Sequence, residues 1–276
     1  MKPIQITAKS IADAWFQLVY NIFDNSYRQD IQQGSFENEQ YRLQYPGVSI
    51  YIEQPFVDMV PYIPPALNLP NPTTEDFIND YFAGYIMNPE LGENETYKYA
   101  TRINETMPMP RPNYMQDKIP IAYESRTQLE VVIDMLRKTP HTNQAVIEIA
   151  KPDDIATCYG KDGKLDPPCL RLIDFKVFPA MPLEPCCEAS SEQCAASNCR
   201  DKNVLSVSVY FRSWDLWAGL PTNLGGIELL KQYVANQTGL INGPMYAYSA
   251  GLHIYGYQEK FARIRTMKAA NVGVEE

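Results

Sequence analysis

Residues 170–177 (LRLIDFKV) and 205–211 (LSVSVYF) largely alternate apolar and polar side chains. A period of two predicts β-strands with one buried face. Because the second run follows the first in the chain, we expect them to pair antiparallel as a hairpin. Between them, residues 179–202 form an unusual tip that holds four of the six cysteines. We interpret this cysteine-rich tip as an insertion within a single domain.

One isolated cysteine, Cys169, precedes the first of these strands in the sequence DPPCL of residues 166–170. A thiolate adds to electron-poor sp² carbons, and neighbouring cations make the thiolate more available. Two prolines stiffen the approach to this cysteine. A lone cysteine is more often buried and inert. However, Arg212 ends the partner strand, so we expect it near the thiol, which favours a reactive cysteine.

The run RSWDLWAGLPTN of residues 212–223 places an arginine, an acid and a carboxamide at fixed offsets. Arg212 can bind a phosphate through its fork of N–H donors, although a surface salt bridge is the default for a lone arginine. The Asn223 carboxamide offers one acceptor and one donor, which match N3–H and O4 of uracil, whereas cytosine presents the opposite pattern. The alternative role for Asn223 is a helix N-cap, and both roles could hold at once.

Three more polar side chains complete the candidate set. Asp215 could accept hydrogen bonds from the N–H donors of a pterin ring. His253 and Tyr255 point the same way if their segment is extended, and together they suit a shared hydroxyl group. A lone histidine is more often structural, so the binding role depends on the neighbouring motifs. The whole set suits attack on a planar base carbon while a phosphate is held.

The rest of the chain reads as a mixture of helices and strands. Three-to-four spacing of apolar residues and strand-type alternation predict regular elements. The expected helices are 11–24, 77–87, 127–138 and 223–236; the expected strands are 47–53 and 145–150, with 245–255 a strand or a short turn and helix. Prolines break residues 54–73 and 104–122. With no repeat and no clear linker, we expect one α/β (α+β) domain over residues 1–276.

Composition narrows the possible partners. The chain has 276 residues and a net charge of −9, which argues against non-specific binding to nucleic acid. A small anionic substrate is still compatible with an acidic protein, because a local arginine site can hold it. No apolar run reaches 18 residues, and the start lacks the apolar core of a secretory signal. We therefore expect a cytoplasmic protein with no membrane partner.

These motifs resemble the thymidylate synthase family, and more closely its short archaeal-type members. The likeness is strong over about residues 127–257 and diffuse before them. Its four motifs occur in the family order: Pro168-Cys169, YFRSxD from Tyr210 to Asp215, Gly219-x-Pro221-x-Asn223 and His253-x-Tyr255. The resemblance implies a mixed β-sheet flanked by helices, a homodimer packed sheet to sheet, and 5,10-methylenetetrahydrofolate as the one-carbon donor.

The resemblance also assigns catalytic roles. Cys169 would attack C6 of the pyrimidine, which makes C5 a nucleophile for the one-carbon unit. Arg212 and Ser213 would hold the 5′-phosphate, and Arg212 would help to keep Cys169 ionised. Tyr99 matches the tyrosine that assists proton removal at C5.

Binding roles follow in the same way. Asn223 would read the uracil edge of the substrate. Asp215 and Gly219 would contact the folate, with Asp215 also at the substrate. His253 and Tyr255 would bind the 3′-hydroxyl of the deoxyribose.

The chain departs from the family pattern at several positions. Leu170 stands where many members have a histidine after the nucleophile. Asn143-Gln144 stands where many members donate an arginine pair to the partner's phosphate site. Arg212 would then do more of the phosphate binding, or Arg102 and Arg126 could substitute.

Two other family features lack a clear counterpart. The helical glutamate of the family has only Asp80 as a candidate. Only 21 residues follow Tyr255, so we expect the long segment that closes over the folate to be absent. Such closure excludes water, and without it water could meet the exocyclic methylene and give a 5-hydroxymethyl product.

The cysteine-rich tip allows several interpretations, and no metal is expected in the chemistry itself. Zinc, disulfides and a reduced loop are all compatible with this spacing. The cysteines concerned are Cys186, Cys187, Cys194 and Cys199.

Three functions follow from these observations. The first is a one-carbon transferase that methylates dUMP to dTMP through a covalent cysteine–C6 adduct. The second is a 5-hydroxymethylase of dUMP or dCMP. The third, of another class, is a catalytically retired homologue that binds a nucleotide or RNA. A pyrimidine deoxynucleotide monophosphate is the expected ligand of the two enzymes.

Overall fold

The computed structural model describes residues 2–31, 40–93, 95, 97–109, 125–160, 166–179 and 203–268, with backbone alone at 157–160. The four cysteines of the tip lie outside these ranges, so the alternatives for them stay open. Among the described residues, no helix is long and apolar enough to cross a membrane. The cytoplasmic location stays a prediction.

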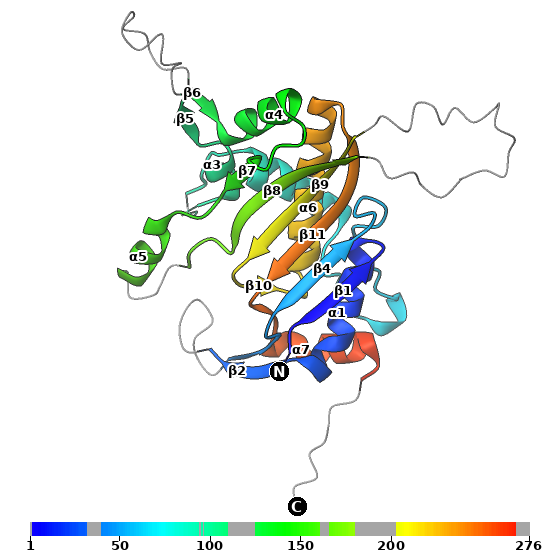
Figure 1. The fold of residues 1–276 in the computed structure, drawn as a ribbon. Helices are drawn as coiled ribbons and strands as arrows, with labels where there is room; N and C mark the ends of the chain where they lie inside the picture. Colours follow the sequence, from blue (N-terminus) through cyan, green and yellow to red (C-terminus); the bar gives the residue numbers. More distant parts are fainter. Residues whose placement is uncertain are drawn as a thin grey trace, which may run out of the picture.

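A mixed six-stranded sheet forms the centre of the molecule (Figure 1). Its strands, in spatial order, are β1 (Ile4–Ala8), β4 (Val48–Ile52), β11 (Ile241–Ser249), β9 (Asn203–Phe211), β8 (Leu170–Pro179) and β7 (Val146–Glu148). The predicted hairpin is confirmed, because β8 and β9 pair antiparallel along their length. The β1–β4 and β9–β11 pairs are parallel. The expected α/β class, a mixed sheet with flanking helices, is confirmed as well.

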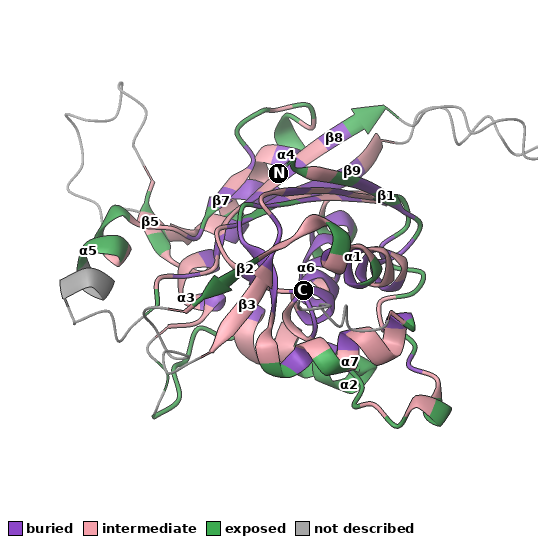
Figure 2. Ribbon diagram, turned by 90° about the horizontal axis from the view of Figure 1, so that it is seen from below, coloured by how far each residue is buried: buried purple, intermediate pink, exposed green. Residues whose placement is uncertain are grey.

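Two helices, α1 (Ile11–Asn25) and α6 (Gly219–Thr238), lie on the same side of this sheet (Figure 2). Helix α1 presents Ile11, Trp15, Leu18 and Ile22 to the core at helical spacing, and all four are fully buried. Its first turn is capped by Ser10, whose hydroxyl accepts from the Asp13 N–H. The apolar periodicity of residues 11–24 therefore predicted this helix correctly.

Helix α6 is buried over most of its surface, because a second layer covers it. That layer contains α2 (Glu75–Tyr81) and the π-helix η2 (Phe82–Met87). Gly225 and Gly226 permit this close packing. A Cβ atom at Gly226 would lie 2.6 Å from the ring of Tyr81, and one at Gly225 would lie 2.8 Å from Ile78.

A smaller sheet brings distant segments together below the main one. Its strands are β10 (Trp214–Asp215), β12 (Leu252–Tyr255), β3 (Tyr41–Gln44) and β2 (Tyr27–Asp30). Strands β10 and β12 run parallel and place Asp215 opposite His253. Helix α7 (Gly256–Thr266) follows β12 directly.

Near the upper end of the sheet lie α3 (Tyr99–Ile103), β5 (Thr106–Pro108), β6 (Ser125–Thr127) and α4 (Gln128–Lys138) (Figure 1). Helix α5 (Pro152–Gly160) lies lower, at the left of Figure 1. A short 3-10 helix, η1, covers Pro65–Leu67. Helix α4 confirms the expected helix over residues 127–138 and begins with a capping box between Thr127 and Glu130. The proline-broken region near residue 106 nevertheless contains a short strand, since β5 pairs with β6.

Two predicted elements differ from the structure. The helix expected to start at residue 223 begins at Gly219, so Asn223 lies inside α6 and is not its N-cap. The reason is Asp215, whose carboxylate accepts from the N–H groups of Trp217, Ala218 and Gly219 and so starts the helix earlier. Residues 245–255 form two strands in different sheets, because the chain turns between Ser249 and Leu252.

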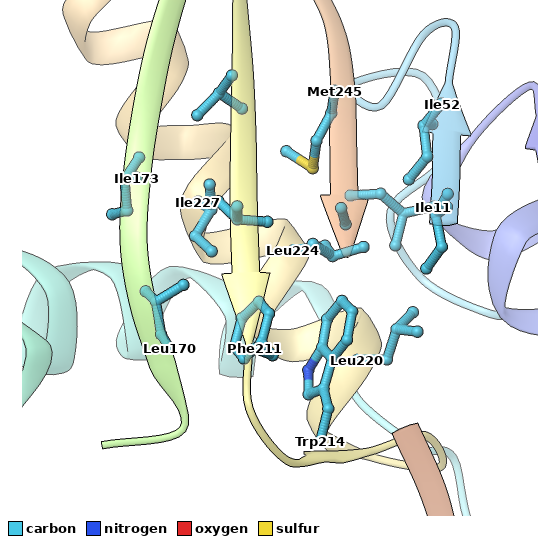
Figure 3. Close-up of a cluster of buried hydrophobic side chains, with 14 of the residues drawn as sticks. Ile11, Ile52, Leu170, Ile173, Phe211, Trp214, Leu220, Leu224, Ile227 and Met245 are labelled. Carbon is cyan, nitrogen blue, oxygen red and sulfur yellow. The ribbon is translucent and has the colours of Figure 1, made fainter. Parts of the chain in front are cut away.

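The core between β9 and α6 supports the segment that follows β9. Figure 3 shows Phe211 and Trp214 side by side, beneath Leu224 of α6. Their rings stack with centroids 4.1 Å apart and an interplanar angle of 5°. Trp214 is 2% exposed and Leu224 is fully buried. This packing holds residues 212–215 rigidly at the lower end of the sheet.

Candidate active site around Cys169

Cys169 lies half-buried at the end of β8, directly opposite the end of β9. The backbone N–H of Arg212 donates to the Cys169 carbonyl at 2.9 Å. The hairpin therefore brings together the thiol and the arginine that sequence reasoning expected to meet. The pairing slips by one residue between Leu170 and Leu172, so Arg171 occupies a β-bulge beside the thiol.

Two guanidinium groups hold the proline segment before the thiol. Arg212 Nε donates to the carbonyl oxygens of Pro167 and Pro168 at 3.2 and 3.3 Å, and a terminal nitrogen of Arg212 also donates to Pro167. Arg171 donates to the Pro168 carbonyl at 3.2 Å. Sequence reasoning missed Arg171; its position two residues after the cysteine was the available signal. Both arginines therefore converge on one carbonyl next to Cys169.

Burial raises the pKa of the Cys169 thiol above its ordinary value of 9.0. The Arg212 and Arg171 guanidinium groups lower this pKa, and the Asp166 carboxylate raises it. The arginine thus acts in the direction expected from the sequence, but burial outweighs it. At neutral pH the thiol form is therefore favoured until something offsets the cost of burying the charge.

Four tyrosine rings form a cluster near the thiol. Tyr81 stacks on Tyr85, Tyr85 meets Tyr99 edge to face, and Tyr97 lies tilted against Tyr99, with centroids 5.2, 5.2 and 6.3 Å apart. Burial raises the pKa of each of these tyrosines, and a negative charge on Cys169 raises it further. The tyrosine cluster and Cys169 pack against the same hydrophobic core.

Tyr99 joins this cluster to the nucleophile's strand. Its hydroxyl accepts from the Leu170 backbone N–H at 3.2 Å. The side chain is 5% exposed, and burial raises its pKa well above the ordinary value of 10.0. Tyr99 is accordingly a neutral phenol, which can donate a hydrogen bond beside Cys169.

The Asn223 carboxamide is held from two sides. Its Oδ1 accepts from the Trp214 indole N–H at 3.0 Å, and its Nδ2 donates to the Tyr81 hydroxyl at 2.9 Å. Since an amide group has two N–H donors and two oxygen lone pairs, one donor and one lone pair remain for another partner. Neither Trp214 nor Tyr81 was singled out from the sequence.

His253 is 1% exposed in β12. Its Nδ1 lies 2.8 Å from the Gly251 carbonyl, which can only accept, so the proton sits on Nδ1. In the described part of the chain, the buried Nε2 has no hydrogen-bond partner. Burial lowers the pKa of His253 below 6.5, which leaves a neutral ring with a bare acceptor. The Tyr255 ring meets it edge to face, with centroids 4.8 Å apart, as expected for alternate residues of a strand.

The backbone before the His253 strand lies in close contact with residues 212–214. The Trp214 N–H donates to the Gly251 carbonyl at 3.0 Å. A Cβ atom at Gly251 would lie 2.7 Å from the Arg212 carbonyl and 3.3 Å from the Ser213 Cα atom. Only glycine permits this approach, which places Ser213 beside the His253 segment.

Asp215 and Gly219 lie at the start of α6. The Asp215 carboxylate accepts three backbone N–H groups at 3.0–3.1 Å, and an ionised carboxylate has about four acceptor positions. A Cβ atom at Gly219 would lie 3.1 Å from the Asp215 Cβ and 3.7 Å from Asn223 Oδ1. A side chain at position 219 would therefore crowd Asp215, and glycine avoids this.

The residues expected to replace the family's arginine pair and its glutamate lie away from the groups around Cys169. Arg102 pairs with Asp154 at 2.6 Å, so it is engaged elsewhere. Arg126 pairs with Asp134 at 3.1 Å. Asp80 is exposed on α2, whereas its neighbour Tyr81 contacts Asn223. The structure therefore gives no support to Asp80 as the counterpart of the family glutamate.

Asn143 and Gln144 line a surface hollow of about 590 Å³ beside α4. A second hollow of about 440 Å³ lies near the end of α6, around Gln232 and Asn236. Cys169 lines neither of them. Its surroundings are the tyrosine cluster and the two guanidinium groups.

The chain is similar to known proteins over most of its length. A provisionally named thymidylate synthase of Methanosarcina acetivorans is 24% identical over 253 residues, which cover 91% of this chain and 89% of that protein. The thymidylate synthase of varicella-zoster virus is 31% identical over 143 residues, covering 52% of this chain and 36% of the viral protein.

Structural comparison agrees on the fold. Thermostable thymidylate synthase A from Bacillus subtilis aligns with a TM-score of 0.57 at 12% identity, covering 95% of this chain and 85% of that one. The family model described as thymidylate synthase matches residues 93–270. The chain therefore belongs to the thymidylate synthase family, whose members are one-carbon transferases that use methylenetetrahydrofolate.

Proposed function

We propose that this protein methylates C5 of dUMP to give dTMP, through a covalent bond between Cys169 and C6. The observation that carries the proposal is that a short hydrogen-bonded segment joins the nucleophile to the base reader. The Arg212 N–H donates to the Cys169 carbonyl at 2.9 Å, and Trp214, two residues after Arg212, donates to the Asn223 carboxamide at 3.0 Å. A pyrimidine read by Asn223 would therefore lie against the thiol.

The nucleotide would be held at its phosphate by Arg212, Ser213 and Arg171. A guanidinium has five N–H donors, so both arginines keep donors after binding the proline carbonyls. Arg171 is our candidate for the role of the arginine pair that the family places where this chain has Asn143-Gln144. A phosphate bound beside these groups would accept charge-assisted hydrogen bonds from both guanidinium groups at the end of the hairpin.

The sugar and base would be held by neutral groups. The bare His253 Nε2 would accept from the 3′-hydroxyl, with Tyr255 beside it. Asn223 Oδ1 would accept from N3–H of uracil, and its free Nδ2 proton would bind O4.

Chemistry would begin when the Cys169 sulfur donates an electron pair to C6. The electron pair of the C5=C6 bond then moves onto C5 and O4, and C5 forms a carbon–carbon bond with the one-carbon unit of the folate. Loss of the C5 proton and of the carbon–nitrogen bond to the folate leaves an exocyclic methylene. Hydride addition to that methylene, with return of the sulfur's electron pair from C6, restores the C5=C6 bond and releases dTMP.

Tyr99 would assist proton removal as a phenol, not as a base. Its raised pKa keeps the hydroxyl protonated, and its contact with the Leu170 N–H fixes it beside the nucleophile. It could therefore orient a water molecule that accepts the C5 proton.

The donor, 5,10-methylenetetrahydrofolate, supplies the one-carbon unit and the hydride. Asp215 and Gly219 fit such a molecule, because the carboxylate keeps about one acceptor position for a pterin N–H and Gly219 adds no side chain beside it. Asp215 would orient the ring near the edge of the base.

We also propose one domain and a homodimer packed sheet to sheet. The sheet face opposite α1 and α6 carries Tyr51, Tyr210, Tyr246 and Tyr248 on the neighbouring strands β4, β11 and β9. The rings of Tyr51 and Tyr246 lie 5.0 Å apart, and Tyr248 is 41% exposed. A row of aromatic residues on a sheet face suits a protein interface.

One assay with dUMP labelled with tritium at C5 tests the proposed reaction. Methylation releases tritium and forms dihydrofolate, which is read by absorbance. Hydroxymethylation, the outcome if water adds to the methylene, releases tritium and leaves tetrahydrofolate. A catalytically retired protein does neither. Only the first result supports the proposal, and either of the others overturns it.

A further inference from the structure

We infer that Trp214 sets the choice of uracil over cytosine by fixing which way the Asn223 carboxamide points. This inference rests on the proposed function, in which Asn223 reads the base. An asparagine that can turn its amide by 180° exchanges donor and acceptor. It could then present the pattern that matches cytosine as easily as the one that matches uracil.

Trp214 removes this freedom because an indole N–H is only a donor. Its Nε1 lies 3.0 Å from the carboxamide atom assigned as Oδ1. A turned amide would place an NH₂ group against that N–H, and two donors would face each other. Trp214 is 2% exposed, so water cannot relieve the conflict. The orientation with Oδ1 towards Trp214 is the one that pairs with N3–H and O4 of uracil.

The indole itself cannot swing away. It stacks on Phe211 at 4.1 Å with nearly parallel planes, and its backbone N–H is tied to Gly251. Figure 3 shows this ring enclosed by Phe211 and the side chains of α6.

Tyr81, on the other side of the carboxamide, has no such effect. A hydroxyl can donate or accept, so it satisfies the amide in either orientation at 2.9 Å. It holds Asn223 in place without selecting its direction. The two neighbours of one carboxamide therefore have separable roles, one in affinity and the other in base choice.

Binding of dUMP and of dCMP, measured by calorimetry on the full chain, tests this division. We expect Trp214→Phe to keep the ring stacking and to reduce the ratio of dCMP to dUMP dissociation constants about tenfold. Tyr81→Phe should weaken both nucleotides alike and leave the ratio unchanged. Trp15→Phe is the matched control, because Trp15 Nε1 donates to the Trp217 carbonyl at 2.9 Å, away from Asn223.

The possible outcomes separate this inference from the proposed function. A wild-type protein that binds neither nucleotide overturns the proposed function. A wild-type preference for dUMP that persists in Trp214→Phe overturns only the role of Trp214. An equal change of ratio in Trp15→Phe or Tyr81→Phe overturns it too. If Trp214→Phe does not fold, benzothienylalanine at position 214 keeps the ring shape without the N–H. The ratio of dCMP to dUMP dissociation constants is then measured on that variant.

Discussion

Helix α6 carries inward-facing polar groups at two places, and they differ in what they bind. Near its start, Asn223 keeps one donor and one lone pair for a partner outside the chain. Two turns later, Glu228 and Lys231 form an ion pair with a separation of 2.9 Å, and neither side chain is exposed. Asn223 is half-buried, whereas Glu228 and Lys231 are completely shielded by the helices and the sheet.

The Glu228–Lys231 pair directs its hydrogen bonds into the protein. Lys231 donates to the Gly243 carbonyl, and Glu228 accepts from Gln232 and Asn242 at 3.1 and 2.6 Å. Asn242 lies at the irregularity where β11 leaves its register with β9. The pair therefore fastens α6 to an irregular strand, which is a structural task.

The groups around Cys169 are arranged in the opposite way. His253 Nε2 has no hydrogen-bond partner within the described residues, and the thiol carries the cost of burial. Such groups lower stability unless a ligand satisfies them. The comparison teaches that the structural end of α6 pairs its buried charges with each other, whereas the binding end leaves a donor and an acceptor that a ligand can satisfy.

The largest expected effect is the loss of turnover in Cys169→Ala. We expect the rate to fall roughly 10⁴- to 10⁶-fold, because the nucleophile is removed. Unfolding free energy should stay within about 1 kcal/mol, and dUMP should still bind. Steady-state kinetics and calorimetry measure these quantities. Wild-type turnover in this variant would remove the basis of the proposed mechanism.

The next effect tests the structural end of α6. Lys231→Met leaves Glu228 buried without its partner, which should cost about 3–5 kcal/mol of unfolding free energy. Urea denaturation measures the loss, and dUMP affinity of the folded variant should not change. The matched control is Lys231→Met combined with Glu228→Gln, which should recover most of the stability. A stable single variant, or one with reduced dUMP affinity, would contradict the division between the two ends.

A smaller effect concerns the bare acceptor of His253. We expect His253→Phe to weaken dUMP binding about tenfold, near 1.4 kcal/mol, because the 3′-hydroxyl loses its partner. The control is a dideoxy nucleotide without that hydroxyl, which should bind both proteins equally. If both ligands lost the same affinity, the histidine would serve only to shape the site.

The smallest effect is a displacement of the Cys169 titration. Asp166 raises the pKa of the thiol and Arg171 lowers it. Asp166→Asn should therefore move the onset of alkylation to lower pH, and Arg171→Gln should move it to higher pH. Iodoacetamide labelling over a pH series, read on the Cys169 peptide by mass spectrometry, measures both. Displacements in the same direction would contradict this account of the local charges.

The raised pKa of Cys169 also makes the stability of the folded protein depend on pH. The folded protein binds the thiol proton more tightly than the unfolded chain does. The associated stability is fully present below the ordinary pKa of 9.0 and is lost as the pH rises through the folded value. Labelling experiments at alkaline pH therefore need a parallel measurement of folding.

The sequence by itself determined the features that depend on local periodicity. Alternation over residues 170–177 and 205–211 predicted the hairpin, and the hairpin alone places Cys169 opposite Arg212. Apolar spacing likewise predicted α1 and α4. The motif order pointed to the family before any coordinates, because each motif lies within a few consecutive residues.

Only the tertiary structure decided how these motifs meet. The early start of α6, the parallel pairing of Asp215 with His253, and the contacts of Trp214 and Tyr81 with Asn223 join residues far apart in the chain or across a turn. A one-residue bulge turned Arg171 towards the proline segment. Such contacts depend on side-chain geometry and packing between elements, which no period or spacing in the sequence encodes.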